Sequence, residues 1–232
     1  MSSHDLHDAA NDPQYVVFPL RRARPKLALL EPAAAPAPTA PSVEFVIATD
    51  ATDFAQADAL VRRCYDWRGY RVGALTVSEG ETTLLARCGG DVIGTITVRG
   101  GVRARLQAET GFAEHLDALR KPGRRLVEYT RFAVDREAQT RHGLDADLAF
   151  SLIERALLIG HLSLGATDCV IEVNPRHARY YERRFGFRHF GAQQDCERVG
   201  APARLLHLNL DIPPACIVSD HGALRRPEPR LH

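Results

Sequence analysis

Two short apolar runs, separated by a long apolar helix pattern, constrain the fold of this chain more than any other feature. The runs at residues 126–135 and 169–173 are typical of strands, and residues 144–162 between them carry apolar side chains at helical spacing. A second helix is predicted after Asn174, with Gly186 as its stop signal. This order predicts two parallel strands joined by a right-handed crossover.

Two charged residues lie inside the first of these strands. A buried parallel strand is normally a near-continuous apolar run, so Glu128 and Arg131 indicate a functional site. Strand alternation puts Glu128 and Thr130 on one face and Arg131 on the other. A β-bulge between them would change that arrangement.

Composition and charge limit the class of protein. The 232 residues suit one domain with tails or two small domains, and 45% hydrophobic with 25% charged residues is ordinary for a soluble core. The net charge of +1 gives no global field for nucleic acid or membrane, so no nucleic-acid partner is expected. Arginines cluster locally, and the clusters are either docking patches for an acidic partner or solvated helix faces. They are Arg62, Arg63, Arg68 and Arg71, and again Arg176, Arg179, Arg183 and Arg184.

Cysteine and histidine usage predicts neither disulfides nor a metal site. The five cysteines are widely spaced without a C-x-x-C pair, and the histidines are scattered. Cys88 and Cys169 lie in apolar runs and are expected to be core thiols, which points to the cytoplasm. No signal peptide is visible, and the longest apolar stretch contains charged residues, so we expect no membrane span. A Gly-x-Ser-x-Gly hydrolase motif is absent.

The chain divides into three parts. Residues 1–42 are expected to be a disordered segment with a Pro/Ala linker, residues 43–210 a folded domain, and residues 211–232 an extended or disordered tail. Further elements are predicted inside the domain. They are a strand at 43–48, a helix from Thr52 or Asp53 to about Tyr65, a hairpin at 82–98, a short helix within 106–120, a loop at 136–143 and a last strand at 204–210.

The order of these elements resembles the GNAT acyltransferase superfamily, and more narrowly the N-acyl amino acid synthases, relatives of the acyl-homoserine-lactone synthases. The resemblance covers roughly residues 43–210. It is carried by Arg62-Arg63-Cys64-Tyr65, by residues 90–95, by Glu128-Tyr129-Thr130-Arg131-Phe132 and by residues 171–182 with Gly186-Phe187. It implies an α+β fold with a GNAT-like mixed central sheet, a splayed parallel strand pair and helices on both faces.

The resemblance also implies a reaction. A fatty acyl group would pass from an acyl carrier protein thioester to the amine of an amino acid, with no bound cofactor. Loop 136–143 has one glycine and a glutamate, which makes it a poor nest for the pyrophosphate of coenzyme A. The single phosphate of an acyl-phosphopantetheine arm is easier to accommodate, with acyl-CoA as the other donor. The competing interpretations are an acetyl-CoA-dependent N-acetyltransferase and a catalytically idle GNAT-like binding module.

Candidate roles follow for individual residues. Glu128 is either the base that deprotonates the acceptor amine or a structural ion-pair partner. Arg131 either binds the acceptor carboxylate or braces the fold by pairing with an acid such as Glu172 or Asp135. Tyr181 is expected to be a core aromatic rather than an acid for the leaving thiolate. The acyl or acceptor pocket is expected to include Tyr65, Trp67, Tyr70, Thr130, Phe132, Asn174 and Tyr181. The alternative for Tyr65, Trp67 and Tyr70 is a hydrophobic lid over the core. Carrier docking is assigned to Arg62, Arg63, Arg68, Arg176 and Arg179.

Overall fold

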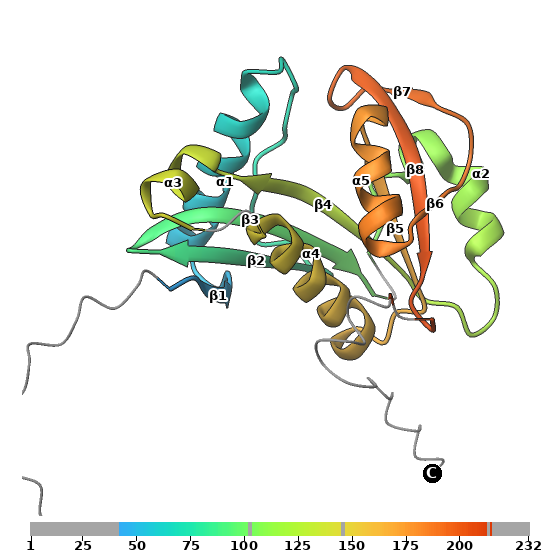
Figure 1. Ribbon diagram of the computed structural model, residues 1–232. Coiled ribbons are helices and arrows are strands. Elements are labelled where there is room, and N and C mark those ends of the chain that lie inside the picture. The colour runs from blue at the N-terminus through green and yellow to red at the C-terminus, as the bar shows by residue number, and fades with distance from the viewer. Residues whose placement is uncertain (1–41, 102–103, 145–146, 213, 215–232) are drawn as a thin grey trace, which may run out of the picture. The chain divides into compact units, whose positions relative to one another are not determined.

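The computed structural model describes residues 42–101, 104–144, 147–212 and 214 (Figure 1). The predicted disordered segment at 1–42 and the predicted tail at 211–232 lie outside these ranges, apart from their boundary residues.

An eight-stranded mixed sheet organises the domain, in the order β1-β2-β3-β4-β5-β8-β6, with β7 paired to β8. Of the pairs in the described residues, β4 with β5 is parallel and the rest are antiparallel, so the predicted parallel crossover pair is confirmed. The strands are β1 (Glu44–Ile47), β2 (Glu81–Cys88), β3 (Asp91–Gly100), β4 (Leu126–Val134), β5 (Asp168–Val173), β6 (Arg188–His189), β7 (Gln194–Cys196) and β8 (Ala201–Asn209).

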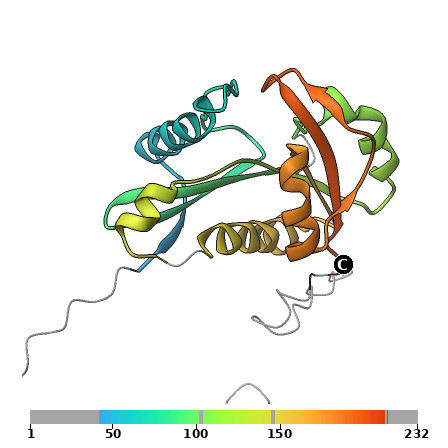
Figure 2. The ribbon, with the colours of Figure 1, turned by 45° about the horizontal axis from the view of Figure 1, so that its top comes forward.

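Helices cover both faces of the sheet (Figure 2). On one face, α1 packs against Leu85 and Ala133, and α2 packs against Val170 and Leu205. The main core lies on the other face, beneath α3, α4 and α5. The helices are α1 (Ala51–Asp66), α2 (Glu109–Leu119), α3 (Arg136–Arg141), α4 (Leu148–Leu158), the π-helical segment η1 (Ile159–Ser163) and α5 (Pro175–Phe185).

Local signals placed some boundaries correctly and others incorrectly. Helix α5 begins and ends as predicted, with Asn174 capping its first turn and Gly186 in the left-handed conformation at φ 77°. The prediction of Thr52 or Asp53 as the cap of α1 was wrong. Asp50 is the cap, because its carboxylate accepts a hydrogen bond from the Asp53 amide.

Three further expectations need correction. The long helix begins at Leu148 rather than at residue 144. The expected loop at 136–143 contains α3, because the Asp135 side chain caps it by accepting from the Ala138 amide. Strands β6 and β7 were not predicted, since both are short and lack apolar alternation.

Strands β4 and β5 are paired at one end and part at the other. Residues 126–129 of β4 pair with residues 168–171 of β5, and the pairing between the two strands ends there. The paired end is fixed by the buried Asp168, which accepts hydrogen bonds from Arg124 at 2.6 Å and Thr167 at 2.6 Å and lies 2.8 Å from the His207 imidazole. Burial would raise the Asp168 pKa, but these partners outweigh it and hold the pKa at about 2. We call the other end, past Tyr129 and Ile171, the open end.

A β-bulge interrupts β4 just where it leaves β5. Thr97 of β3 lies opposite Thr130 and Thr95 lies opposite Ala133, so Arg131 and Phe132 together face one residue of β3. Arg131 has a φ of 52°, and it is the one non-glycine residue with positive φ in the described part of the chain. The bulge turns Arg131 to the face that Glu128 occupies, against simple strand alternation.

Candidate active site

Glu128 lies on β4 immediately before the open end, and its side chain is almost fully buried at 1% exposure. Its carboxylate accepts two backbone hydrogen bonds from the turn before α2, one from the Gln107 amide and one from the Ala108 amide at 3.0 Å. These bonds fix the carboxylate on the α2 face of the sheet.

The surroundings of Glu128 bring its pKa close to neutrality. Desolvation by burial is the largest effect and raises the pKa to about 7. The Gln107 hydrogen bond and the positive charge of Arg198 oppose this rise, while the negative charge of Glu172 adds to it. A carboxyl group with a pKa near 7 can exchange protons with a substrate at physiological pH.

The open end is crossed by contacts between the segment after α1 and the start of α5. The Tyr70 hydroxyl accepts hydrogen bonds from the side-chain amide (Nδ2) of Asn174 at 3.1 Å and from the Arg176 guanidinium at 3.1 Å. Tyr65 packs edge-on against Tyr70 and donates its hydroxyl proton to the Phe132 carbonyl at 3.1 Å. Tyr181 lies near Tyr65, and its pKa is raised by burial and then by the neighbouring Tyr65 phenol. The structure therefore brings together five of the seven predicted pocket residues, namely Tyr65, Tyr70, Phe132, Asn174 and Tyr181.

The remaining predicted pocket residues differ in position. Thr130 lies on the Glu128 face beside the bulge, and its buried hydroxyl has no hydrogen-bond partner within the described ranges. Trp67 is 72% exposed at the end of α1, where the Arg68 guanidinium lies 4.3 Å from its ring centroid. The structure thus places Trp67 on the surface rather than in a pocket.

Arg131 is held by an acid that the sequence did not suggest. Its guanidinium lies 3.2 Å from the Glu81 carboxylate on β2, and Glu81 also pairs with Arg99. Arg131 pairs with an acid, as one of the two interpretations predicted, but the suggested partners were wrong. Glu172 pairs with Arg198, and Asp135 pairs with Arg63. The Arg131 guanidinium therefore braces β4 against β2 through Glu81.

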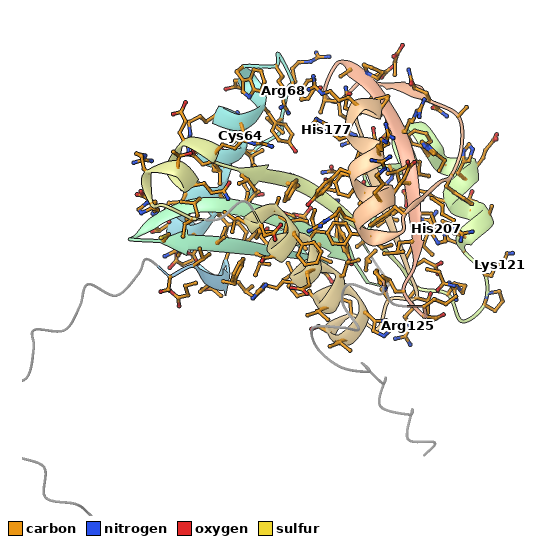
Figure 3. All side chains as sticks on the ribbon, viewed as in Figure 1. Cys64, Arg68, Lys121, Arg125, His177 and His207 are labelled. Atoms are coloured by element: carbon orange, nitrogen blue, oxygen red, sulfur yellow. The ribbon has the colours of Figure 1, made fainter. Side chains whose placement is uncertain are left out.

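Several arginines gather around the open end, and we call Arg68, Arg136, Arg176 and Arg179 the basic rim. Burial, and then the charges of Arg176, Arg68 and Arg136, lower the pKa of His177 at the start of α5. Figure 3 shows Arg68 and His177 on opposite sides of the gap between α1 and α5. Within the described residues no acid lies at ion-pair distance from these four arginines.

The other two predicted docking arginines are paired to acids. Arg62 lies 2.6 Å from Asp58 on the same helix, and Arg63 lies 2.7 Å from Asp135. Glu172 and Glu182 are the acids nearest in sequence to Arg176 and Arg179, and both pair with other residues, Glu182 with His189 and Glu172 with Arg198.

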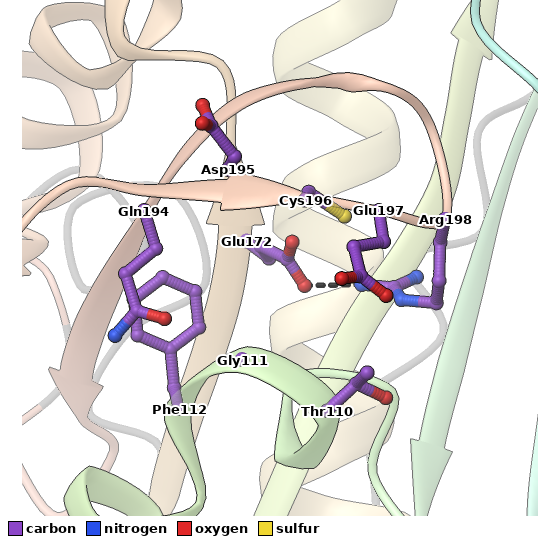
Figure 4. A pocket seen from close by; sticks show the side chains of 9 residues that line it. All are labelled: Thr110, Gly111, Phe112, Glu172, Gln194, Asp195, Cys196, Glu197 and Arg198. Atoms are coloured by element: carbon purple, nitrogen blue, oxygen red, sulfur yellow. Dashed lines mark hydrogen bonds and ion pairs between the residues drawn. The ribbon is translucent and has the colours of Figure 1, made fainter.

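A cavity that the sequence did not predict lies between α2, β5 and the β7–β8 turn (Figure 4). We call it the Arg198 cavity, and its volume is about 220 Å³. It could have been suspected from Glu172, a charge inside the apolar 169–173 run, by the reasoning applied to Glu128. Its lining residues are Thr110, Gly111, Phe112, Glu172, Gln194, Asp195, Cys196, Glu197 and Arg198.

Two other kinds of feature are absent from the part of the chain that the structure describes. No cluster of three or more histidine, cysteine or acidic side chains there could hold a metal ion. No helix there is long and apolar enough to cross a bilayer.

Comparisons with known proteins agree on the fold and the family. The solved structure of FeeM, an N-acyl amino acid synthase from uncultured soil microbes, is 25% identical, with a TM-score of 0.68 over 74% of this chain and 93% of that chain. The acyl-homoserine-lactone synthase LasI is 14% identical, with a TM-score of 0.55 over 82% of this chain and 100% of that chain. An acyl-CoA N-acyltransferase from Pseudomonas aeruginosa is 15% identical, with a TM-score of 0.51 over 72% and 99% of the two chains. The last two comparisons show the fold alone, and no curated protein sequence matches the chain.

The family model named N-acyl amino acid synthase FeeM matches residues 56–209. That range is more than half of the chain, and it includes Glu128, the open end and the Arg198 cavity. The mixed sheet with its parted parallel strands is the GNAT-like arrangement expected from the sequence. The chain therefore belongs to the N-acyl amino acid synthase family of GNAT-type acyltransferases.

Proposed function

We propose that the protein transfers a fatty acyl group from the phosphopantetheine thioester of an acyl carrier protein to the amine of an amino acid. One observation carries the proposal. Glu128 is a buried carboxyl group with a pKa of about 7, and it lies at the point where β4 and β5 part. Ligands of α/β sheets gather at the carboxyl ends of such strands.

Amide formation requires a neutral amine, and amino groups are mostly protonated at pH 7. In the proposed reaction the Glu128 carboxylate takes a proton from the acceptor ammonium, directly or through a water molecule. The freed nitrogen attacks the thioester carbonyl carbon, the C–N bond forms and the C–S bond breaks. The nitrogen loses a second proton as the amide forms, the sulfur gains one proton, and it leaves as the phosphopantetheine thiol.

Two features support a carrier-bound donor over free coenzyme A. The amide of Ala138 in the segment after β4 is already bonded to the Asp135 carboxylate, and that carboxylate would repel a pyrophosphate. The second feature is the positive charge of the basic rim at the open end, because none of its four arginines is paired to an acid within the described residues. It complements the acidic surface of a carrier protein and the single phosphate of its arm.

The proposed function is tested by incubating the purified protein with an acylated carrier protein and each common amino acid, followed by mass spectrometry of the products. We expect an N-acyl amino acid that requires the carrier-bound donor. Acetylation of amines from acetyl-CoA without a carrier would identify an acetyltransferase instead. Carrier binding without product from any donor would identify an idle binding module.

A charge reversal tests the docking role of the rim. Arg176→Glu with Arg179→Glu should raise the KM for the carrier-bound donor, leave a small thioester surrogate unaffected, and have less effect at high salt. The matched control, Arg183→Glu with Arg188→Glu, makes the same charge change on exposed residues away from the start of α5. Equal losses with carrier and surrogate would assign these arginines a structural role and move docking toward Arg62, Arg63 and Arg68.

A further inference from the structure

The Arg198 cavity lies on the sheet face that holds the Glu128 carboxylate, between α2 and the β7–β8 turn (Figure 4). Its volume of about 220 Å³ is below the roughly 300–1,000 Å³ of pockets for drug-sized ligands. A space of this size suits a small metabolite rather than a fatty acyl chain with its carrier arm.

The charges around the cavity suit a small zwitterion. Glu172 and Glu197 contribute carboxylates to its lining and Arg198 contributes a guanidinium, whereas the Asp195 carboxylate points away from the cavity (Figure 4). Glu172 from β5 and Arg198 from the turn point toward each other and form an ion pair, as Figure 4 shows. A ligand ammonium group would be attracted to the carboxylates, and a ligand carboxylate has the guanidinium as its partner.

Arg198 retains hydrogen-bonding capacity for such a ligand. One terminal nitrogen donates to the Gln107 side-chain oxygen at 2.9 Å, and the other donates to Glu172. A guanidinium has five N–H donors, and these two contacts use one on each terminal nitrogen, so each terminal nitrogen has a second N–H. A carboxylate is the natural acceptor for a guanidinium donor.

The cavity is coupled to Glu128 through Gln107. The Gln107 backbone amide donates to the Glu128 carboxylate, and its side-chain oxygen accepts from Arg198. Arg198 and Glu172, which both line the cavity, also act on Glu128 through their charges. An amine held in the cavity would therefore lie close to the proposed base.

We infer that the Arg198 cavity binds the acceptor amino acid, with its carboxylate on Arg198 and its amine directed toward Glu172 and Glu128. The acyl thioester enters separately, through the open end between β4 and β5. The inference rests on the proposed function and adds the place, the orientation and the carboxylate receptor of the acceptor. It assigns the receptor role to Arg198 rather than to Arg131, because Arg198 lines the cavity and Arg131 does not.

The test compares the best acceptor from the screen described above with its own carboxamide, which keeps the amine and side chain but lacks the negative charge. The wild-type kcat/KM should favour the free amino acid by about tenfold or more, because the guanidinium site would be left unfilled by the amide. Arg198→Gln should bring the ratio close to one, mainly by raising the KM for the free amino acid. The KM for the donor should stay unchanged.

The ratio of two acceptors does not depend on how much of a variant preparation is folded, so partial misfolding cannot mimic the result. Arg198→Lys keeps the charge and should retain part of the preference, and Arg183→Gln, an exposed arginine on α5, should keep all of it. An unchanged ratio in Arg198→Gln, or equal loss with both acceptors, would overturn the inference while leaving the proposed function standing. Absence of any acylated amine with the wild-type protein would instead refute the proposed function.

Discussion

Replacing Glu128 with glutamine should remove most of the acyl transfer and at the same time make stability less dependent on pH. The buried carboxyl has a pKa of about 7 in the folded protein and 4.5 as its ordinary value. Because the folded-state pKa is raised, the stabilising contribution is complete below pH 4.5 and is lost as the pH rises through 7. The site that suits proton transfer is therefore a cost to folding.

The size of this cost follows from the two pKa values. The difference corresponds to about 3 kcal/mol once the pH is above both, at roughly 1.4 kcal/mol for each tenfold change. Of this, about 2 to 3 kcal/mol should be lost between pH 5 and pH 8. Glu128→Gln cannot ionise and escapes that loss. It gives up one favourable backbone contact, since its amide group would face either the Gln107 or the Ala108 N–H, but this cost is the same at every pH.

The measurement is urea unfolding of both proteins at pH 5, 6, 7 and 8, followed by circular dichroism. The free energy of unfolding of the variant minus that of the wild type should rise by about 2 to 3 kcal/mol across this range. Subtraction removes titrations that the two proteins share. A rise of less than about 1 kcal/mol would show that Glu128 does not titrate near neutrality, and the argument for it as the base would lose its main support.

Three further perturbations have defined outcomes. Asp168→Asn should cost about 2 kcal/mol at pH 7, because the folded-state pKa is held at about 2, and urea unfolding should show that cost shrinking as the pH falls from about 4 to 2. Gly160→Ala should lower thermal stability, since its Cβ would lie 2.6 Å from the Tyr129 hydroxyl oxygen, and adding Tyr129→Phe should recover part of the loss. Tyr70→Phe removes the hydroxyl that accepts from Asn174, so trypsin should cleave the segment after α1 several times faster, with equal rates contradicting the bridge.

The sequence was sufficient where short-range chemistry decides the structure. Helix α5 is bounded by an asparagine cap, a proline in the first turn and a glycine that adopts positive φ, and each acts within a few residues of its neighbours. The β4 run was likewise recognised to within one residue, since the predicted range was 126–135 and the strand is Leu126–Val134. Glu128 stood out because a charge in a buried strand needs a partner or a purpose.

Long-range pairing was beyond the sequence. Arg131 pairs with Glu81, 50 positions away on β2, and strand periodicity alone does not choose among distant acids. The Arg198 cavity depends on β7, whose Gln-Asp-Cys sequence has no strand-like alternation. Its arginine lies in the polar turn between β7 and β8, so nothing local marked it as part of a site.

The bulge residue Arg131 also limits how this position can vary. Its φ of 52° favours glycine on backbone grounds, whereas the buried Glu81 favours a cation. No single residue type satisfies both demands. In a library randomised at residue 131 and selected for folded protein, arginine should persist despite its strained backbone. Glycine at residue 131 should become competitive when Glu81 is replaced by glutamine. The neutral glutamine side chain does not need the positive charge that Arg131 supplies to the Glu81 carboxylate. The two positions should therefore vary together.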